Sequence, residues 1–137
     1  MGQNIHATCI NLNSKGILIL GASGSGKSDL ALRLITMFSA KLVSDDRTDV
    51  QNVFGRLEAS APKTLEGLLE VRGVGIIKTE YIKKTNIDVA IELTTEKPER
   101  MPDAKKYEIE GIKIPLFYLN PFEVSAPSKA VAILSLL

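Results

Sequence analysis

Apolar residues recur along this chain in two patterns, and their order predicts a mixed α/β domain. The run 17–20 is wholly apolar and stops at a glycine, which is typical of a buried strand. Over 27–38 the apolar positions recur every three or four residues, which predicts a helix with one buried face. A further strand is expected at 41–44. Strand, glycine loop, helix and strand together indicate a βαβ unit with a right-handed crossover.

The rest of the pattern predicts strands and turns around this unit. Residues 5–12 alternate loosely and favour a strand. The other expected elements are a turn at 13–16, a hairpin over 48–60 around Phe54 and Gly55, a strand-like segment over 68–77 interrupted by Gly73 and Gly75, a polar connector at 81–85, a strand at 87–93, a charged loop at 96–106, two strands over 107–119 that break near Glu110 and Gly111, and a short apolar helix from Ser128. We therefore expect a mixed sheet around the βαβ unit, in a single domain covering residues 1–137.

Composition narrows the classes of partner. A hydrophobic content of 45% and a charged content of 24% are those of a globular domain. The 17 basic and 16 acidic residues leave a formal charge of +1, without the basic excess that nucleic-acid binders carry. Aromatic residues make up only 5%, which argues against a stacking surface for single-stranded nucleic acid. We expect a small anion and another protein as partners, and no nucleic acid.

The chain also lacks the marks of an exported or membrane protein. No apolar stretch reaches the roughly 20 residues that span a bilayer. The first residues have neither the basic start nor the apolar run of a signal peptide. The single cysteine, Cys9, cannot form an internal disulfide. These features favour a cytoplasmic location and no membrane partner.

The segment after the apolar run 17–20 matches the pattern G-x-x-x-x-G-K-[ST] at every position. Its residues are Gly21, Ala22, Ser23, Gly24, Ser25, Gly26, Lys27 and Ser28. The segment lies where its chemistry needs it, between a buried strand and an amphipathic helix. The alternative is a chance match in a turn of small residues, but a complete match in this context makes chance improbable.

Such a loop binds phosphates for local physical reasons. Gly21, Gly24 and Gly26 have no Cβ, so their backbone N–H groups can approach phosphate oxygens. The start of the following helix adds unpaired donors and a partial positive charge. Lys27 supplies a full charge for the β- and γ-phosphates, and the Ser28 hydroxyl can ligate magnesium. We predict ATP or a close relative, with Mg²⁺, as the cofactors.

Two adjacent carboxylates, Asp45 and Asp46, end the strand that follows the helix. At least one of them is expected at the carboxyl edge of the sheet, beside the phosphate loop. One carboxylate there can hold magnesium, and the other can accept a proton from an attacking hydroxyl. A surface turn or helix cap is the alternative role for such a pair. With the phosphate loop upstream, we favour the functional interpretation.

A third block completes a combination of motifs that resembles a known family. Residues 69–77 read L-E-V-R-G-V-G-I-I, and they join the phosphate loop, Asp45-Asp46 and the segment His6-Ala7-Thr8. Together these blocks resemble the catalytic domain of the HPr kinase/phosphorylase family. The resemblance runs from His6 to about Ile77 with little slippage, and more loosely to the C-terminus. It implies a P-loop-containing kinase domain of the HPr kinase type.

The resemblance implies ATP-dependent phosphorylation of a serine in HPr, or in an HPr-like phosphocarrier of the phosphotransferase system. The family's site residues carry over onto matching positions of this sequence. The resemblance assigns Asp45 as the proton acceptor of the target serine, Lys27 to the phosphates, Ser28 and Glu70 to magnesium, and His6 and Arg100 to further catalytic roles. We assign Asp46, the other carboxylate of the pair, to magnesium.

Several of these residues also have ordinary structural roles open to them. His6 is the only histidine, and a lone strand histidine is commonly structural. Glu70 could form a surface ion pair with Arg72, and the nearby glycines could mark only a bulge. Arg100 lies in a charged loop. Cys9, three residues after His6 in the predicted strand, points to the opposite face and is expected in the core.

The chain departs from the longer members of the family in two ways. Because His6 falls almost at the start, the chain resembles the short form typical of alphaproteobacteria, which lacks the N-terminal domain. The segment that longer relatives use for dephosphorylation has no counterpart at 116–123, which weakens the case for phosphorylase activity. Longer relatives are hexamers, so a homo-oligomer is expected, with a number of subunits that the sequence does not give.

Two other functions remain open on the sequence. A small-molecule kinase would use the same phosphate loop, but it needs a lid and an acceptor pocket, for which the chain has little spare length. A nucleotide-responsive regulatory module would bind ATP and signal through its partners without transferring phosphate. Tight ATP binding with no transfer to any carrier would favour this second alternative.

Overall fold

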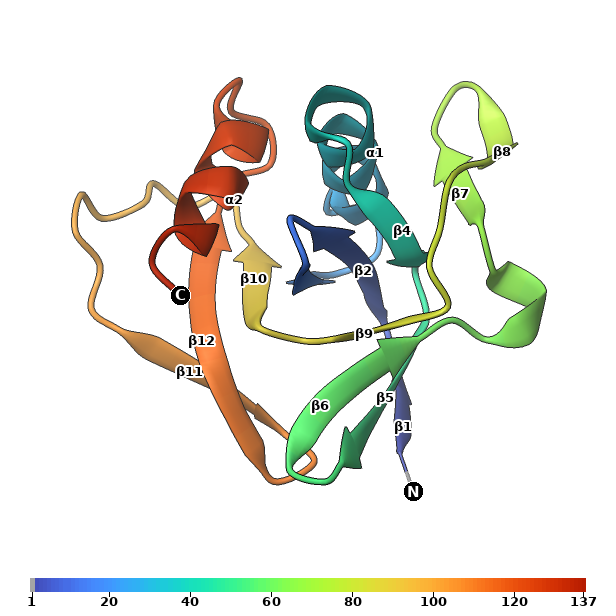
Figure 1. Cartoon of the computed structure of the whole chain (residues 1–137). Helices are drawn as coiled ribbons and strands as arrows, with labels where there is room; N and C mark the ends of the chain where they lie inside the picture. Colours follow the sequence, from blue (N-terminus) through green and yellow to red (C-terminus); the bar gives the residue numbers. More distant parts are fainter. Residues whose placement is uncertain (1) are drawn as a thin grey trace.

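A six-stranded mixed sheet forms the centre of the molecule (Figure 1). The structure is a computed structural model, and it describes residues 2–137. The strands of this sheet are β2 (Ala7–Leu12), β3 (Lys15–Leu20), β4 (Lys41–Ser44), β10 (Val89–Leu93), β11 (Lys105–Ile109) and β12 (Ile112–Leu119). Their order is β11-β12-β10-β3-β2-β4. β3, β10 and β12 are parallel, β2 is antiparallel to both β3 and β4, and β11 is antiparallel to β12.

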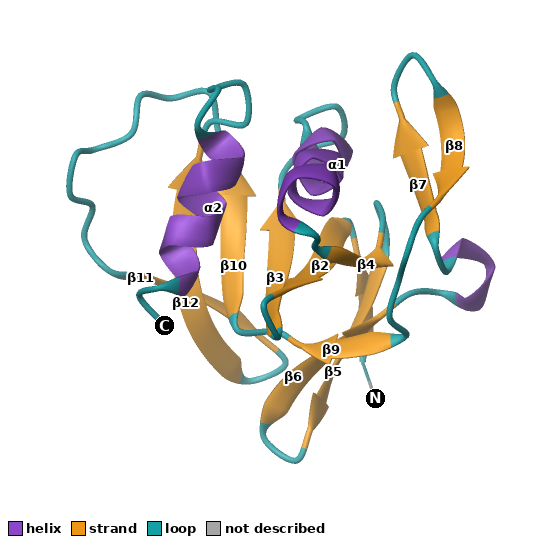
Figure 2. Cartoon of the chain, turned by 45° about the horizontal axis from the view of Figure 1, so that its top comes forward, coloured by secondary structure: helices purple, strands orange, loops and turns teal. Residues whose placement is uncertain are grey.

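Two helices, α1 (Lys27–Phe38) and α2 (Ala126–Leu134), lie on one face of this sheet (Figure 2). Leu30 and Leu34 of α1 pack with Ile17 and Ile19 of β3 in the core under the helices. α1 ends where Ser39 takes a left-handed conformation (φ 61°) and its N–H bonds to a carbonyl of the last turn. Within residues 2–137, no helix combines the length and the apolar character needed to cross a membrane.

A second, antiparallel sheet covers the opposite face. Its strands are β1 (Gln3–Ile5), β5 (Thr48–Val53), β6 (Arg56–Ser60) and β9 (Lys84–Asn86), in the order β1-β5-β6-β9. A separate hydrophobic cluster joins Cys9 and Leu18 of the large sheet to Val50 and Leu57 of the second. Because alternate residues of a strand face opposite sides, β3 is buried on both faces, which explains its uniformly apolar run.

A hairpin stands beside α1 at the β4 edge (Figures 1 and 2). It consists of β7 (Leu68–Val71) and β8 (Gly75–Lys78), which form a two-stranded antiparallel sheet. A short 3₁₀ helix, Lys63–Leu65, precedes it. Leu69 is fully buried in the cluster under α1, so the hairpin is anchored to the body by its first strand.

Several predicted elements are confirmed, and others need correction. The helix at 27–38, the strand at 41–44, the hairpin over 48–60 and the break near Glu110 agree with the structure. The strand predicted at 5–12 is wrong, because the chain bends at His6 and divides into β1 and β2 of different sheets. His6 is therefore not a strand residue opposite Cys9, although Cys9 is fully buried as expected.

The remaining differences concern where elements begin and end. The polar connector predicted at 81–85 runs into β9, and the strand predicted from residue 87 begins at Val89. The charged loop expected at 96–106 ends earlier, because β11 starts at Lys105. The last helix begins at Ala126, two residues before the predicted start, with Pro127 in its first turn.

Candidate active site

The phosphate loop joins β3 to α1 at the carboxyl edge of the parallel strands. Ligands of α/β sheets bind at this edge, where loops leave the strands and helix N-termini point. Gly21 and Gly26 have backbone conformations that favour glycine, with φ of 155° and 104°. A Cβ on Gly21 would come within 2.5 Å of Ser25 Oγ, and one on Gly26 within 3.3 Å of the Pro121 ring. Glycine is therefore required at both positions by the shape of the loop.

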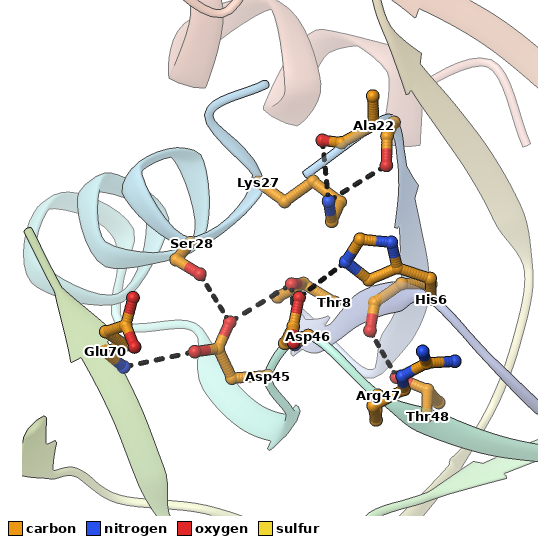
Figure 3. A network of polar contacts seen from close by, with 12 residues as sticks. His6, Thr8, Ala22, Lys27, Ser28, Asp45, Asp46, Arg47, Thr48 and Glu70 are labelled. Atoms are coloured by element: carbon orange, nitrogen blue, oxygen red, sulfur yellow. Dashed lines mark hydrogen bonds and ion pairs between the residues drawn. The ribbon is translucent and has the colours of Figure 1, made fainter. Parts of the chain in front are cut away.

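Lys27 lies within its own loop. The side-chain Nζ donates to the backbone oxygens of Gly21 (2.9 Å) and Ala22 (3.0 Å), and the residue is only 5% exposed (Figure 3). Burial lowers the pKa of Lys27 from its ordinary value, while the negative charges of Asp46 and Asp45 act in the opposite direction. The result is an ammonium group held at the mouth of the loop, close to two carboxylates.

Asp45 is the centre of a hydrogen-bond network that draws on three elements (Figure 3). Its Oδ1 accepts from the hydroxyls of Ser28 (2.6 Å) and Thr8 (3.1 Å), and its Oδ2 accepts from the backbone N–H of Glu70 (3.1 Å). The residue is 7% exposed. A buried carboxylate needs such donors, and α1, β2 and β7 each provide one.

Asp46 has a different environment from its neighbour. It takes a left-handed backbone conformation (φ 67°), and its carboxylate is bonded to His6 (Figure 3). The Nε2–H of His6 donates to Asp46 Oδ1 at 2.6 Å, and the Asp46 side chain is 62% exposed. The bend at His6 between β1 and β2 is what brings the ring to this carboxylate.

One pocket collects most of the predicted residues. Its volume is about 390 Å³, and its lining consists of Ser23, Gly24, Gly26, Lys27, Ser28, Asp29, Leu32, Asp45, Asp46, Glu70, Val71, Arg72 and Phe122. The ion pair considered between Glu70 and Arg72 is not formed among the described residues. His6 is not part of the lining, but it is hydrogen-bonded to Asp46, which is.

Gly21, Ala22, Ser25 and Arg100 are also predicted site residues outside the lining, and of these only Arg100 is not part of the phosphate loop. It lies in the exposed loop between β10 and β11 and is absent from the lining. Its catalytic role stays a prediction. Conversely, Thr8 and Phe122 were not singled out from the sequence, although Thr8 belongs to the block His6-Ala7-Thr8. No pattern in the sequence indicates Phe122, because its place depends on how the turn after β12 packs against the phosphate loop.

The oxygen atoms that could act as metal ligands on the Asp45 side of the pocket suit a magnesium ion. They are hydroxyl and carboxylate oxygens from Ser28, Asp45 and, at the rim, Glu70. Among residues 2–137 there is no group of three or more His, Cys, Asp or Glu side chains arranged to hold a metal by themselves. Magnesium at a phosphate site is bound by one or two carboxylates, waters and substrate phosphates. The residues present therefore fit magnesium bound together with a nucleotide.

Comparison with known proteins decides which family combines these features. Residues 1–132 match the family described as HPr Serine kinase C-terminal domain. The chain belongs to this family. The resemblance inferred from the His6 segment, the phosphate loop, Asp45-Asp46 and the block 69–77 is thereby confirmed.

Curated relatives and a solved structure agree with membership of the HPr kinase C-terminal domain family. The chain is 38% identical over 132 residues to the HPr kinase/phosphorylase of Malacoplasma penetrans, covering 87% of this chain and 43% of that protein. It is 35% identical to the enzyme of Brevibacillus brevis, covering 80% and 38%. The chain thus spans about two fifths of the length of these relatives. The Hpr(Ser) kinase/phosphatase from Coxiella burnetii has a TM-score of 0.79 and 26% identity, covering 98% of this chain and 99% of that one.

Proposed function

We propose that this chain is an ATP-dependent serine kinase whose acceptor is HPr or an HPr-like phosphocarrier. The observation that carries the proposal is that the Lys27 ammonium and two carboxylates, Asp45 and Asp46, face one pocket on the phosphate loop. Family membership and the names of the relatives support a phosphocarrier serine as the acceptor. The names of the curated relatives also refer to phosphorylase activity. This activity is a separate question, which is tested by starting from the phosphorylated carrier.

Phosphoryl transfer depends on positioning and charge neutralisation more than on covalent chemistry of the protein. The backbone N–H groups of the loop and the start of α1 would hold the phosphates of ATP. Lys27 would exchange its bonds to the Gly21 and Ala22 carbonyls for phosphate oxygens. Its charge acts from a nearly buried position, where attraction to an anion is weakly screened.

Magnesium, when bound, would neutralise charge on the phosphate oxygens. The sequence assigns Ser28, Glu70 and Asp46 to this ion. The 2.6 Å hydrogen bond from Ser28 Oγ to Asp45 Oδ1 favours Asp45 over Asp46 as a residue that would hold the ion together with Ser28. Glu70, whose side chain lines the pocket, remains the second carboxylate candidate.

The same contacts bear on the proton acceptor for the incoming hydroxyl. The sequence assigns this role to Asp45. However, three protein groups already donate hydrogen bonds to the Asp45 carboxylate. Asp46 is more exposed, and His6 holds its carboxylate in a fixed orientation. We therefore propose that the roles are exchanged, with Asp46 accepting the proton and His6 positioning it.

A transfer assay tests the proposal. The purified chain is incubated with Mg-ATP and HPr-like carriers, and the carriers are weighed by intact-mass spectrometry. We expect one phosphate on a carrier serine in the wild type, and weaker ATP binding with no transfer in Lys27→Ala. In Asp45→Asn and Asp46→Asn we expect much slower transfer with largely intact ATP binding. Arg100→Ala in the same assay tests whether the predicted arginine takes part.

The assay also separates the alternatives. Transfer at the wild-type rate in Lys27→Ala would overturn the phosphate-loop interpretation. Absence of transfer to any carrier, with ATP binding confirmed by calorimetry, would favour a nucleotide-binding regulatory module. Incubation of the phosphorylated carrier with the chain and inorganic phosphate tests phosphorylase activity directly.

A further inference from the structure

The turn between β12 and α2 presents an exposed aromatic ring to the phosphate pocket. Phe122 lines this pocket and is 70% exposed. Among residues 2–137, it is the only aromatic side chain in the lining. A large apolar side chain in that position needs an explanation, because nothing in the catalytic arrangement proposed above uses it.

The backbone on both sides of Phe122 is held firmly. Its own N–H donates to the side-chain oxygen of Asn120 (3.0 Å). The guanidinium of Arg33, from α1, donates to the carbonyl oxygens of Pro121 and Glu123, the residues before and after the ring. The exposure of the ring is therefore not a consequence of a loose turn, since neighbouring peptide groups are fixed to α1.

The turn is also in direct contact with the phosphate loop. Pro121 is buried, and its ring lies so close to Gly26 that a Cβ there would be 3.3 Å from it. Gly26 is the last loop residue before α1. The Phe122 ring thus stands one residue away from the part of the chain that packs on the loop.

The strand order places this ring and the carboxylates on opposite sides of the loop. In the order β12-β10-β3-β2-β4, the phosphate loop follows β3, Asp45 and Asp46 follow β4, and Phe122 follows β12. Figure 1 shows the corresponding ends of β4 and β12 on either side of α1. The carboxylates mark the side where the transferred phosphate and its acceptor belong. The nucleoside of the same molecule then extends toward the β12 side.

We propose that Phe122 is the stacking surface for the nucleobase of the bound nucleotide. Aromatic rings bind bases through their faces, with little preference among bases. The ring is a binding residue and takes no part in the transfer itself. Arg33 and Asn120 position it through the backbone. The inference rests on the proposed function, which supplies the nucleotide on the phosphate loop and the side of the loop where its transferred phosphate lies.

Calorimetry with two ligands tests the proposal. Mg-ATP and magnesium tripolyphosphate share the phosphate chain, but only ATP has a base. In Phe122→Ala we expect the Kd for ATP to rise about tenfold, as for loss of one stacked base, and the Kd for tripolyphosphate to stay unchanged. Mg-GTP should weaken by a similar factor. The matched control is Phe54→Ala, which removes a fully exposed phenylalanine from the β5–β6 turn and should change neither Kd.

Fluorescence of a tryptophan variant tests the stacking proposal independently of calorimetry. The chain contains no tryptophan, so Phe122→Trp introduces a single reporter at the site. We expect ATP to quench its fluorescence by stacking and tripolyphosphate to leave it unchanged. Val124→Ala, which alters a fully exposed residue of the same turn that lies outside the pocket lining, should bind ATP like the wild type.

Three results would overturn the inference. An unchanged ATP Kd in Phe122→Ala with a raised KM for the carrier would identify the ring as a contact for the acceptor protein. Equal weakening of ATP and tripolyphosphate would mean that the turn supports the loop and does not contact the base. Equal quenching of Phe122→Trp by both ligands would lead to the same conclusion. If the chain phosphorylates no carrier but still binds ATP in a way that depends on Phe122, the kinase proposal is refuted and the stacking proposal is supported.

Discussion

The hydroxyl of Thr8 connects the two aspartates of the site. It donates to Asp45 Oδ1 and accepts from the backbone N–H of Asp46, each at 3.1 Å. The residue is fully buried, so both bonds form away from water and restrict the geometry strongly. Two neighbouring residues of the same type are thereby given different surroundings. Asp45 faces Ser28, whereas Asp46 faces His6 and solvent.

The proposed division of roles can be tested by a magnesium titration. In Asp45→Asn, loss of a metal-side carboxylate should raise the magnesium concentration needed for half-maximal transfer, and excess magnesium should restore part of the rate. In Asp46→Asn, loss of the proton acceptor should lower kcat about 10²–10⁴-fold at every magnesium concentration. The reverse outcome, with the magnesium requirement shifted only in Asp46→Asn, would support the roles assigned from the sequence.

The pKa of Lys27 gives the site a predictable response to pH. Burial lowers this pKa, so in the unliganded protein Lys27 loses its proton below the usual lysine value of about 10.4. Nucleotide phosphates favour the charged form. Affinity should therefore be full below the lowered pKa and fall as pH rises through it, with proton uptake on binding in that range.

Calorimetry of ATP binding between about pH 7 and pH 10, in two buffers of different ionisation enthalpy, measures both effects. Lys27→Arg is the matched control, because arginine stays charged throughout this range. Its affinity, whatever its absolute value, should not fall over the same interval. A decline of equal size in both proteins would assign the pH dependence to another group.

At the scale of elements, the phosphate loop is shaped as much by the β12–α2 turn as by its own glycines. Gly26 has a φ of 104° and faces the ring of Pro121, which Arg33 holds in place from α1. Loop, helix and turn therefore form one packed unit. A side chain at Gly26 would have to displace the turn as well as strain the backbone.

We therefore predict different effects for two glycine variants with similar backbone strain. Gly26→Ala and Gly111→Ala each place a side chain at positive φ, at a cost of about 1–2 kcal/mol in the free energy of unfolding. Gly111 has open space around it, whereas Gly26 does not. Only Gly26→Ala should weaken binding of tripolyphosphate and ATP alike, as measured by calorimetry. If Gly111→Ala weakens binding equally, the effect comes from general destabilisation.

The elements that could be predicted from the sequence are those defined by neighbouring residues. Spacing within 27–38 was enough for α1, and the complete loop motif was enough for the position of the phosphate site. The bend at His6 could not be predicted, because two strands in different sheets have the same alternation as one strand. The bonds of Thr8 to Asp45 and of Arg33 to Pro121 join residues 37 and 88 positions apart. Such pairings follow from the sheet order, which local patterns do not contain.

At the scale of the whole molecule, the large sheet separates two hydrophobic clusters. One lies under α1 and α2, and the other lies between the large sheet and the antiparallel sheet. Strands β2 and β3 contribute to both clusters, with alternate residues facing alternate sides. The strands that carry Thr8 and the phosphate loop are therefore enclosed on both faces, which makes them a rigid support for the site.

Cys9 offers a direct test of this enclosure. Its thiol is fully buried between the two sheets, and burial also raises its pKa, which makes the reactive thiolate scarce in the folded protein. We expect a thiol reagent to label native protein at least about a thousandfold more slowly than protein in denaturant, because labelling requires the sheets to separate. Increasing urea should release labelling in parallel with the loss of far-UV circular dichroism. Labelling at urea concentrations well below the unfolding midpoint would show that the antiparallel sheet detaches on its own. In that case Leu57→Ala, which removes packing from that sheet, should lower the urea concentration needed for labelling more than it lowers the unfolding midpoint.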